Sequence, residues 1–210
     1  MGTPFENYDE LIKFFPDESF VRRKVDRLKA IAPDIQMLRQ LQILDLGCGS
    51  EDSKDAFIED VKIFSPWYCR LAHAAGADVL GIDIADNRGE DFRSERRDLL
   101  QPGSLDDLPS ESFDAVNNDG FTVSDESFYV GLAGQSPTAL RMALRQCSLW
   151  KRLNILDHSM EIAQEQLQKI NQRIRNDVSR LLRDGGLYSN MELIYRKIDG
   201  GLVLQKERLI

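Results

Sequence analysis

The sequence predicts an α/β protein: a Rossmann-like, mostly parallel sheet of about six strands with helices on both faces. Short apolar segments recur through the first half of the chain, and several of them end in an acidic or amide side chain. A long amphipathic segment follows in the second half. Because open parallel sheets bind ligands at the carboxyl ends of their strands, the pattern also predicts which edge of the sheet holds the site.

The first apolar segment, Ile43-Leu44-Asp45-Leu46, runs directly into the turn Gly47-Cys48-Gly49. Glycines allow a sharp turn and let a ligand lie against bare backbone amides. Asp45 adds an acidic side chain, and Cys48 is a small residue beside the ligand. We interpret this turn as a cofactor loop; an ordinary strand-to-loop turn is the alternative.

Three further segments have a similar form. Val79–Ile84 carries Asp83 near its end, where a carboxylate can accept both hydroxyls of a ribose. Glu95–Leu100 contains Asp98, and Phe113–Asn118 ends in two amides. Polar groups therefore recur at four successive strand ends, which predicts a ligand site built from all four.

The segments DLGCG, GID, RRDL and FDAV, followed by LLRDGGL at 181–187, together resemble the class I S-adenosylmethionine-dependent methyltransferases. The resemblance spans about Leu41 to Leu187. It implies that the glycine turn lines the methionine part of the cofactor, that Asp83 holds the ribose and that Asp98 with Leu99 faces the adenine. Asn117 would close the site from the fourth strand. The implied cofactor-binding residues are Asp45, Gly47, Cys48, Gly49, Asp83, Ile84, Asp98, Leu99 and Asn117.

A nicotinamide dinucleotide is the competing cofactor, because that fold also has a glycine turn and an acid after the second strand. The third glycine of its motif would fall at Asp52, whose carboxylate would repel a pyrophosphate. S-adenosylmethionine has no phosphate and carries a positive sulfonium. Two features depart from the methyltransferase pattern: Glu51 replaces a small residue, and Gly49 lies further from Asp83 than the ~20 positions usual for such motifs.

The long interval between Gly49 and Asp83 contains start and stop signals for a helix. Ser65 and Pro66 predict a helix start and Gly76 a stop, so the first crossover helix is expected over Pro66 to Ala75. Its buried side would carry Trp67, Leu71 and Ala74. Residues 51–64 remain as an acidic insertion, interpreted either as a short helix over the methionine end or as a solvated loop.

Helical covers are expected on both sides of the site. Apolar residues at steps of three and four predict a long helix from about His158 to Asp184, which Gly185-Gly186 would end. Residues 122–160 form a helical insertion between the fourth and fifth strands, with a lid, a homodimer surface and a simple cap as its alternative roles. Residues 1–40 form an N-terminal helical cover, whose main helix opens at Pro16 and Asp17.

The C-terminal part predicts an antiparallel edge to a sheet of order 3-2-1-4-5. Two alternating strands are expected over Leu187 to Lys197 and Leu202 to Arg208. The residues between them, Ile198-Asp199-Gly200-Gly201, are a hairpin signal.

Composition limits the function. With 210 residues, 42% of them hydrophobic, the chain is expected to form a single domain over 1–210. Its net charge of −8 opposes nucleic-acid binding. No apolar run approaches the ~20 residues that span a bilayer, and no signal pattern is present, so we expect a cytoplasmic protein without a membrane partner. Cys48, Cys69 and Cys147 are widely spaced, which indicates neither a disulfide framework nor a zinc site.

The expected function is methyl transfer from S-adenosylmethionine to a small-molecule substrate. The catalytic residues are not identified; Asp119 and His158 are candidate bases. The alternative is a protein that binds S-adenosylmethionine, or a non-methylating enzyme that uses the cofactor structurally. Only the first should transfer a labelled methyl group.

Overall fold

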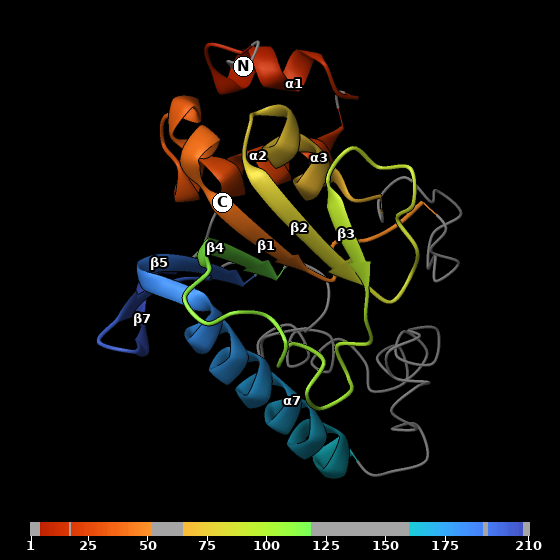
Figure 1. Ribbon diagram of the computed structural model, residues 1–210, viewed down its shortest axis with the longest axis vertical. Helices are drawn as coiled ribbons and strands as arrows, with labels where there is room; N and C mark the ends of the chain where they lie inside the picture. The colour runs from red at the N-terminus through yellow and green to blue at the C-terminus, as the bar shows by residue number, and fades with distance from the viewer. Residues whose placement is uncertain (1–4, 17, 52–64, 119–159, 191–192, 208–210) are drawn as a thin grey trace.

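The computed structural model describes residues 5–16, 18–51, 65–118, 160–190 and 193–207 (Figure 1). Their centre is a seven-stranded sheet of order β3-β2-β1-β4-β5-β6-β7. Its first five strands are parallel, and β6 and β7 run antiparallel at one edge. In chain order the strands are β1 (Gln42–Leu46), β2 (Asp78–Asp83), β3 (Arg93–Arg96), β4 (Phe113–Asn118), β5 (Leu182–Asn190), β6 (Leu193–Ile198) and β7 (Gly201–Glu207). The predicted Rossmann-like fold, strand order and antiparallel edge are confirmed.

The sheet has seven strands where about six were expected, and the long helix ends at Leu181 rather than near Asp184. β5 begins at Leu182, and what was expected as one strand from Leu187 to Lys197 is the end of β5 together with β6. The glycines at 185 and 186 lie inside β5, in an irregularity where pairing jumps from Phe113 with Leu182 to Ala115 with Leu187. This bulge needs glycine, because Gly185 has φ 78° and a Cβ at 186 would lie 2.9 Å from the carbonyl oxygen of residue 183.

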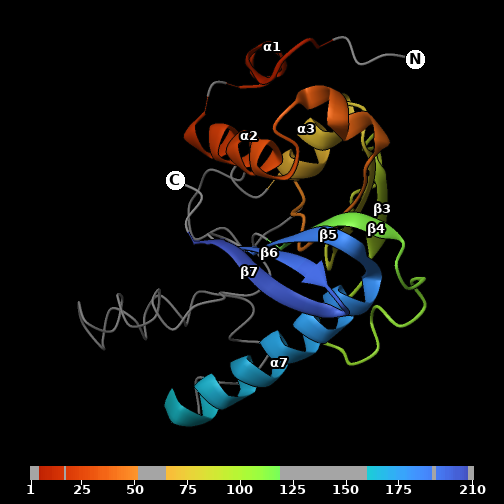
Figure 2. The ribbon, with the colours of Figure 1, turned by 90° about the vertical axis from the view of Figure 1, so that its left-hand side faces the viewer.

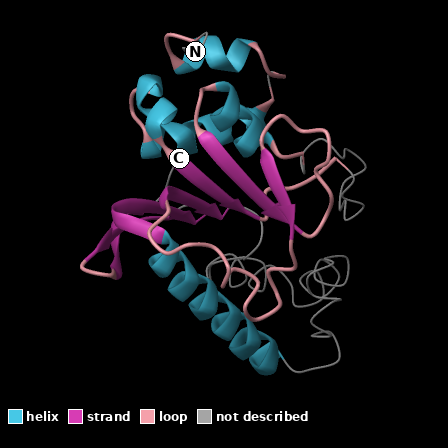
Figure 3. Ribbon diagram, in the orientation of Figure 1, coloured by secondary structure: helices cyan, strands magenta, loops and turns pink. Residues whose placement is uncertain are grey.

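Helices cover both faces of the sheet, as predicted. Figures 1 and 2 show α1 (Tyr8–Lys13), α2 (Ser19–Ile31) and α3 (Trp67–Ala74) on one side and α7 (Met160–Leu181) on the other. A 3-10 helix, η1 (Ile35–Gln40), leads into β1. The layers in Figure 3 are therefore helix, sheet and helix.

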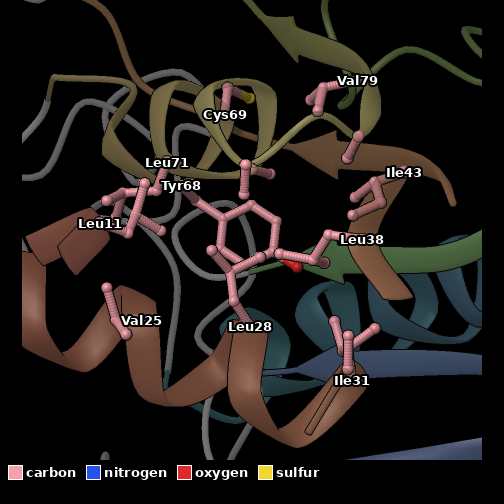
Figure 4. Close-up of a cluster of buried hydrophobic side chains, with 14 of the residues drawn as sticks. Leu11, Val25, Leu28, Ile31, Leu38, Ile43, Tyr68, Cys69, Leu71 and Val79 are labelled. Atoms are coloured by element: carbon pink, nitrogen blue, oxygen red, sulfur yellow. The ribbon is translucent and has the colours of Figure 1, made fainter. Parts of the chain in front are cut away.

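The face under α2 and α3 has its own hydrophobic core. Val21, Val25 and Leu28 of α2 are buried against strand residues such as Ile43. The Tyr68 ring of α3 lies in the middle of this cluster (Figure 4). Helix α2 was expected to open at Pro16 and Asp17, but it begins at Ser19 and has no side-chain cap. The N-terminal cover also contains α1 and η1, which no signal predicted.

The α7 face is held by apolar packing and by arginines. Ile174, Val178 and Leu181 belong to a second core that also includes residues of β1, β2 and β4. Arg173 donates to the carbonyl oxygens of residues 99 and 100, and Arg180 donates to those of 105 and 108. These arginines therefore fasten the chain between β3 and β4, a role beyond favourable interaction with the helix dipole.

The crossover helix α3 lies close to its prediction. Its apolar residues Trp67 and Leu71 are buried, and Gly76 ends it with φ 95°. The predicted cap is wrong: Pro66, not Ser65, precedes the first helical residue, and it makes no side-chain cap bond.

Several expectations concern residues outside the described ranges. They are the helical insertion at 122–160 apart from residue 160, the acidic segment at 52–64, the candidate bases Asp119 and His158, and Cys147. Among the residues that are described, no helix is both long and apolar enough to cross a membrane.

Candidate functional site

The glycine turn after β1 is hydrogen-bonded to the end of β2. The N–H groups of Gly47 and Cys48 donate to the carbonyl of Ile82 at 2.8 and 3.2 Å. The N–H of Gly49 donates to Asp83 Oδ2 at 2.9 Å. Gly47 and Gly49 have φ values of 69° and 89°, in the left-handed region that favours glycine. The turn and the neighbouring strand end therefore form one unit.

Asp83 uses both carboxylate oxygens in this unit. Besides the bond to Gly49, its Oδ1 accepts from the N–H of Ala85 at 2.9 Å. A carboxylate has about four lone-pair sites, so two backbone bonds leave acceptor capacity for the hydroxyls of a ligand. Asp83 is partly buried, and the side chain that follows, Ile84, is 41% exposed. Asp83 thus shapes the glycine turn and keeps acceptor sites for a ligand.

Asp45 lies inside the protein. It is 2% exposed, and its carboxylate accepts from Asn117 Nδ2 at 2.7 Å and from Cys69 Sγ at 3.3 Å. Burial raises the pKa of Asp45, while the positive charge of Lys24 on α2 opposes that rise. Burial lowers the pKa of Lys24 to about 8. Asp45 is therefore the centre of a buried polar network beneath the glycine turn.

A row of polar side chains crosses three strands at this level. Asp45 of β1 pairs in register with Asn117 of β4, which pairs with Ser189 of β5. All three are almost fully buried. Because Ile43 and Ala115, two residues earlier on their strands, belong to the core under α2 and α3, Asp45 and Asn117 point to that face. We call Asp45, Asn117 and Ser189 the polar row.

The polar row is incompletely bonded. Within the part of the chain that the structure describes, Asn117 Oδ1 and Ser189 Oγ have no hydrogen-bond partner, and neither has the buried hydroxyl of Tyr68 on α3. The carboxylate of Asp45 fixes the orientation of the Asn117 amide, because Nδ2 must face it; Oδ1 is therefore an acceptor directed elsewhere. Chemically, the row offers hydrogen bonds that hold and orient a polar group.

The opposite face of the same strand ends is also polar. Asn118 Nδ2 donates to the Tyr188 hydroxyl at 3.2 Å. Burial raises the pKa of that hydroxyl to about 12, so Tyr188 stays protonated at neutral pH. Asn190, which pairs with Asn118, has a buried Oδ1 without a partner among the described residues. The sequence analysis did not single out Ser189 or Asn190, because their strand was expected to continue to Lys197, whereas β5 ends at Asn190.

The residues expected around the adenine lie beyond the end of β3. Asp98 Oδ1 accepts from the N–H of Leu100, and Oδ2 accepts from the amide of Gln101. Leu99 is buried, and its carbonyl accepts from Arg173 at 2.6 Å. The structure therefore fixes this segment through α7. Among all the expected cofactor-binding residues, only Ile84 is an exposed apolar side chain.

Two residues that the motifs did not include stabilise the glycine turn. Asn87 is buried, and its Nδ2 donates to the carbonyl of Gly49 at 2.9 Å. Ser50 Oγ donates to the carbonyl of Asp86 at 2.6 Å. The sequence does carry a signal for this contact: turn-forming residues follow the second strand as Asp86-Asn87-Arg88-Gly89.

A charged cluster borders the turn on the α3 side. Arg70 donates through Nε and one terminal nitrogen to the Glu90 carboxylate at 2.9 and 2.5 Å, and that nitrogen also donates to Glu51 at 2.8 Å. The guanidinium lies 4.9 Å from the ring centre of Trp67. Glu51, unexpected in the methyltransferase pattern, is thus one partner of an arginine. Over the described ranges, no group of three or more His, Cys, Asp or Glu side chains is placed to hold a metal ion.

Comparison with known proteins adds little to this geometry. No family model and no curated protein matches the chain. Among solved structures, it matches a Burkholderia thailandensis 1,6-didemethyltoxoflavin-N1-methyltransferase, crystallised with 1,6-didemethyltoxoflavin and S-adenosylhomocysteine. The match has 14% identity, covers 95% of this chain and 67% of the other, and has a TM-score of 0.35. So low a TM-score carries no argument about function.

Proposed function

We infer that the protein is an S-adenosylmethionine-dependent methyltransferase acting on a small molecule. The observation that carries this inference is the glycine turn bound through Gly49 to Asp83 on the adjacent parallel strand. β1 pairs with β2 on one side and with β4 on the other, so the turn lies where the strand order reverses. Open α/β sheets bind ligands at that point.

The described residues fit the parts of this cofactor. The backbone of the glycine turn would lie against the methionine end, and Asp83 has lone pairs left for two ribose hydroxyls. The exposed side chain of Ile84 would contact the adenine ring. Asp45 and Asn117 would support the turn from beneath, through buried side chains that are hydrogen-bonded to each other.

The charge around the turn favours a cationic cofactor over a dinucleotide. Asp83 is bonded directly to the turn, and Glu51 and Glu90 stand beside it, with Arg70 as their shared partner. A pyrophosphate would be repelled by these carboxylates, whereas a sulfonium would be attracted. When bound, S-adenosylmethionine supplies a methyl group on a positively charged sulfur.

The chain's own contribution to the reaction would be positioning. Methyl transfer requires the acceptor atom, the methyl carbon and the sulfur to be aligned, and hydrogen bonds to the acceptor can supply this alignment. Asn117 and Ser189 have buried oxygens at the strand ends next to the turn that are without partners among the described residues. We infer a small acceptor because the net charge of −8 opposes binding to nucleic-acid phosphates.

Calorimetric titration of the full chain with S-adenosylmethionine, S-adenosylhomocysteine and NADH tests the proposal. Both sulfur compounds should bind, and NADH should not. Asp83→Ala should weaken S-adenosylhomocysteine binding by about 1.5 to 3 kcal/mol, the range for hydrogen bonds to a charged group. Asp78→Ala is the matched control, because Asp78 is the carboxylate at the other end of β2 and forms an exposed ion pair with Arg93. NADH binding, or equal losses in the two variants, would contradict the proposal.

Transfer is tested separately from binding. Incubation with methyl-labelled S-adenosylmethionine and a metabolite extract should place label in a small molecule. Binding without transfer would instead support the alternative of a protein that uses the cofactor structurally.

A further inference from the structure

Cys48 and Cys69 meet beneath Gly81. Cys48 belongs to the glycine turn, Cys69 to α3, and Gly81 to β2. A Cβ at Gly81 would lie 3.0 Å from the sulfur of each cysteine, so both sulfurs occupy the space that a side chain would fill. The two thiols are also close enough for each to influence the pKa of the other. Their spacing in the sequence does not reveal this contact, because the fold creates it.

The surroundings of the two sulfurs differ. Cys69 Sγ donates to Asp45 Oδ2 at 3.3 Å, so a carboxylate is in place to take its proton. Cys48 Sγ accepts from Asn87 Nδ2 at 3.4 Å, a contact that favours a negative sulfur. Cys48 is 8% exposed, whereas Cys69 is not exposed at all. An oxidant would therefore reach Cys48 first, with Cys69 behind it as the second thiol.

We propose that Cys48 and Cys69 are a peroxide-sensitive pair whose disulfide fastens the glycine turn to α3. In the first step the Cys48 sulfur attacks one peroxide oxygen: an S–O bond forms, the O–O bond breaks, and the departing hydroxide takes up the Cys48 proton as water. In the second step Cys69 gives its proton to Asp45 and attacks the Cys48 sulfur. The S–S bond forms, the S–O bond breaks, and hydroxide leaves and is protonated to water. Two thiols and one hydrogen peroxide give one disulfide and two waters.

The disulfide changes the turn on which cofactor binding depends. An S–S bond of about 2.05 Å is shorter than any non-bonded sulfur contact, so the sulfurs must move together. This movement disturbs the bonds from Cys69 to Asp45 and from Asn87 to Cys48. Burial raises the pKa of both thiols, so the reaction is slow at neutral pH and faster at higher pH.

Peptide mapping of the full chain tests the pair. After treatment with hydrogen peroxide at mildly alkaline pH, free thiols are blocked with iodoacetamide and the protein is digested with trypsin without reduction. Cleavage after lysine and arginine places the two cysteines in peptides 40–54 and 63–70, and Cys147 in peptide 146–151. We expect the first two peptides linked, lighter by two hydrogen atoms than their sum, and separated by dithiothreitol.

Serine variants provide the controls. Cys147→Ser, outside the proposed pair, should leave the linked peptide unchanged, while Cys69→Ser should abolish it and let Cys48 proceed to sulfinic acid. Circular dichroism checks that each variant is folded. A link from Cys48 to Cys147, or Cys48 oxidised beyond sulfenic acid in the wild type without any link to Cys69, would overturn the proposal.

The effect on the ligand rests on the proposed function. Affinity for S-adenosylhomocysteine should fall by at least about tenfold on oxidation and recover with dithiothreitol. In Cys69→Ser, where Cys48 proceeds to sulfinic acid, dithiothreitol should restore no affinity. If the linked peptide forms and affinity is unchanged, the disulfide does not control the turn. If the reduced protein never binds S-adenosylhomocysteine, the proposed function fails while the peptide map still decides the thiol pair.

Discussion

The strand ends of β1 and β2 differ from those of β4 and β5 in how completely the chain satisfies their buried polar groups. At β1 and β2, Asp45 accepts bonds from two side chains, and Asp83 accepts bonds from two backbone N–H groups. At β4 and β5, oxygens of Asn117, Ser189 and Asn190 are buried and have no partner within the described part of the chain. One pair of ends is already bonded, and the other has hydrogen bonds still to make.

This difference indicates that the two pairs of strand ends have different roles in ligand binding. A buried polar atom without a partner costs about 1 to 3 kcal/mol, so neighbouring ones on paired strands are retained at a cost in stability. Water or a bound molecule can supply their hydrogen bonds. The hydrogen-bonded ends of β1 and β2 thus suit a preformed cofactor turn. The ends of β4 and β5 suit hydrogen bonding to a molecule that binds there.

Removing the carboxylate of Asp45 should have the largest effect. Asp45→Ala takes away the hydrogen-bond partner of the buried Asn117 and Cys69 side chains and the negative charge facing Lys24. We expect the free energy of unfolding to fall by about 3 to 5 kcal/mol, measured by urea denaturation. Asp78→Ala, at the exposed start of β2, should cost less than about 1 kcal/mol. Equal losses in the two variants would show that the buried network around Asp45 contributes no more to stability than an exposed ion pair.

A second carboxylate in the polar row should make stability depend on pH. Asn117→Asp places it about where the amide now lies 2.7 Å from Asp45, so the pair shares a proton and one pKa rises further. A carboxyl whose folded-state pKa is raised holds a proton that the unfolded chain has released, so stability falls as pH rises. We expect a loss relative to wild type of up to about 1.4 kcal/mol per pH unit above roughly pH 4, measured by urea denaturation. A loss independent of pH would mean that water separates the two carboxylates.

Lys24 tests the same network from α2. Burial lowers its pKa in the folded protein to about 8, from the 10.5 of an ordinary lysine side chain. Between these values the unfolded chain keeps a proton that the folded protein has released, so the lysine's contribution to stability rises with pH. Relative to Lys24→Met, the wild type should gain stability from pH 8 to 10, by less than about 1.4 kcal/mol per unit because water partly reaches the ammonium. Parallel pH profiles would place Lys24 in solvent.

The sequence allowed the strand order and the glycine turn to be predicted because both depend on local patterns. Apolar runs, turn residues and the acid at position 83 lie within a few residues of the structure they determine. The partners of Asp45 could not be predicted in this way, since Lys24, Cys69 and Asn117 come from three separate elements. Ser189 was missed for a different reason. One strand was expected from Leu187 to Lys197, whereas β5 ends at Asn190, so Ser189 was not recognised as lying at a strand end.

The smallest effect is expected at the unbonded end, in Ser189→Ala. Its hydroxyl is buried and without a partner among the described residues, so removing it gives up no hydrogen bond within them. The free energy of unfolding should change by less than about 1 kcal/mol, toward higher stability. Tyr188→Phe is the matched control: it removes the neighbouring buried hydroxyl, which accepts from Asn118 at 3.2 Å, and should cost about 1 to 2 kcal/mol. If urea denaturation shows equal losses, the Ser189 hydroxyl is satisfied in the free protein, and the contrast between the two pairs of strand ends is wrong.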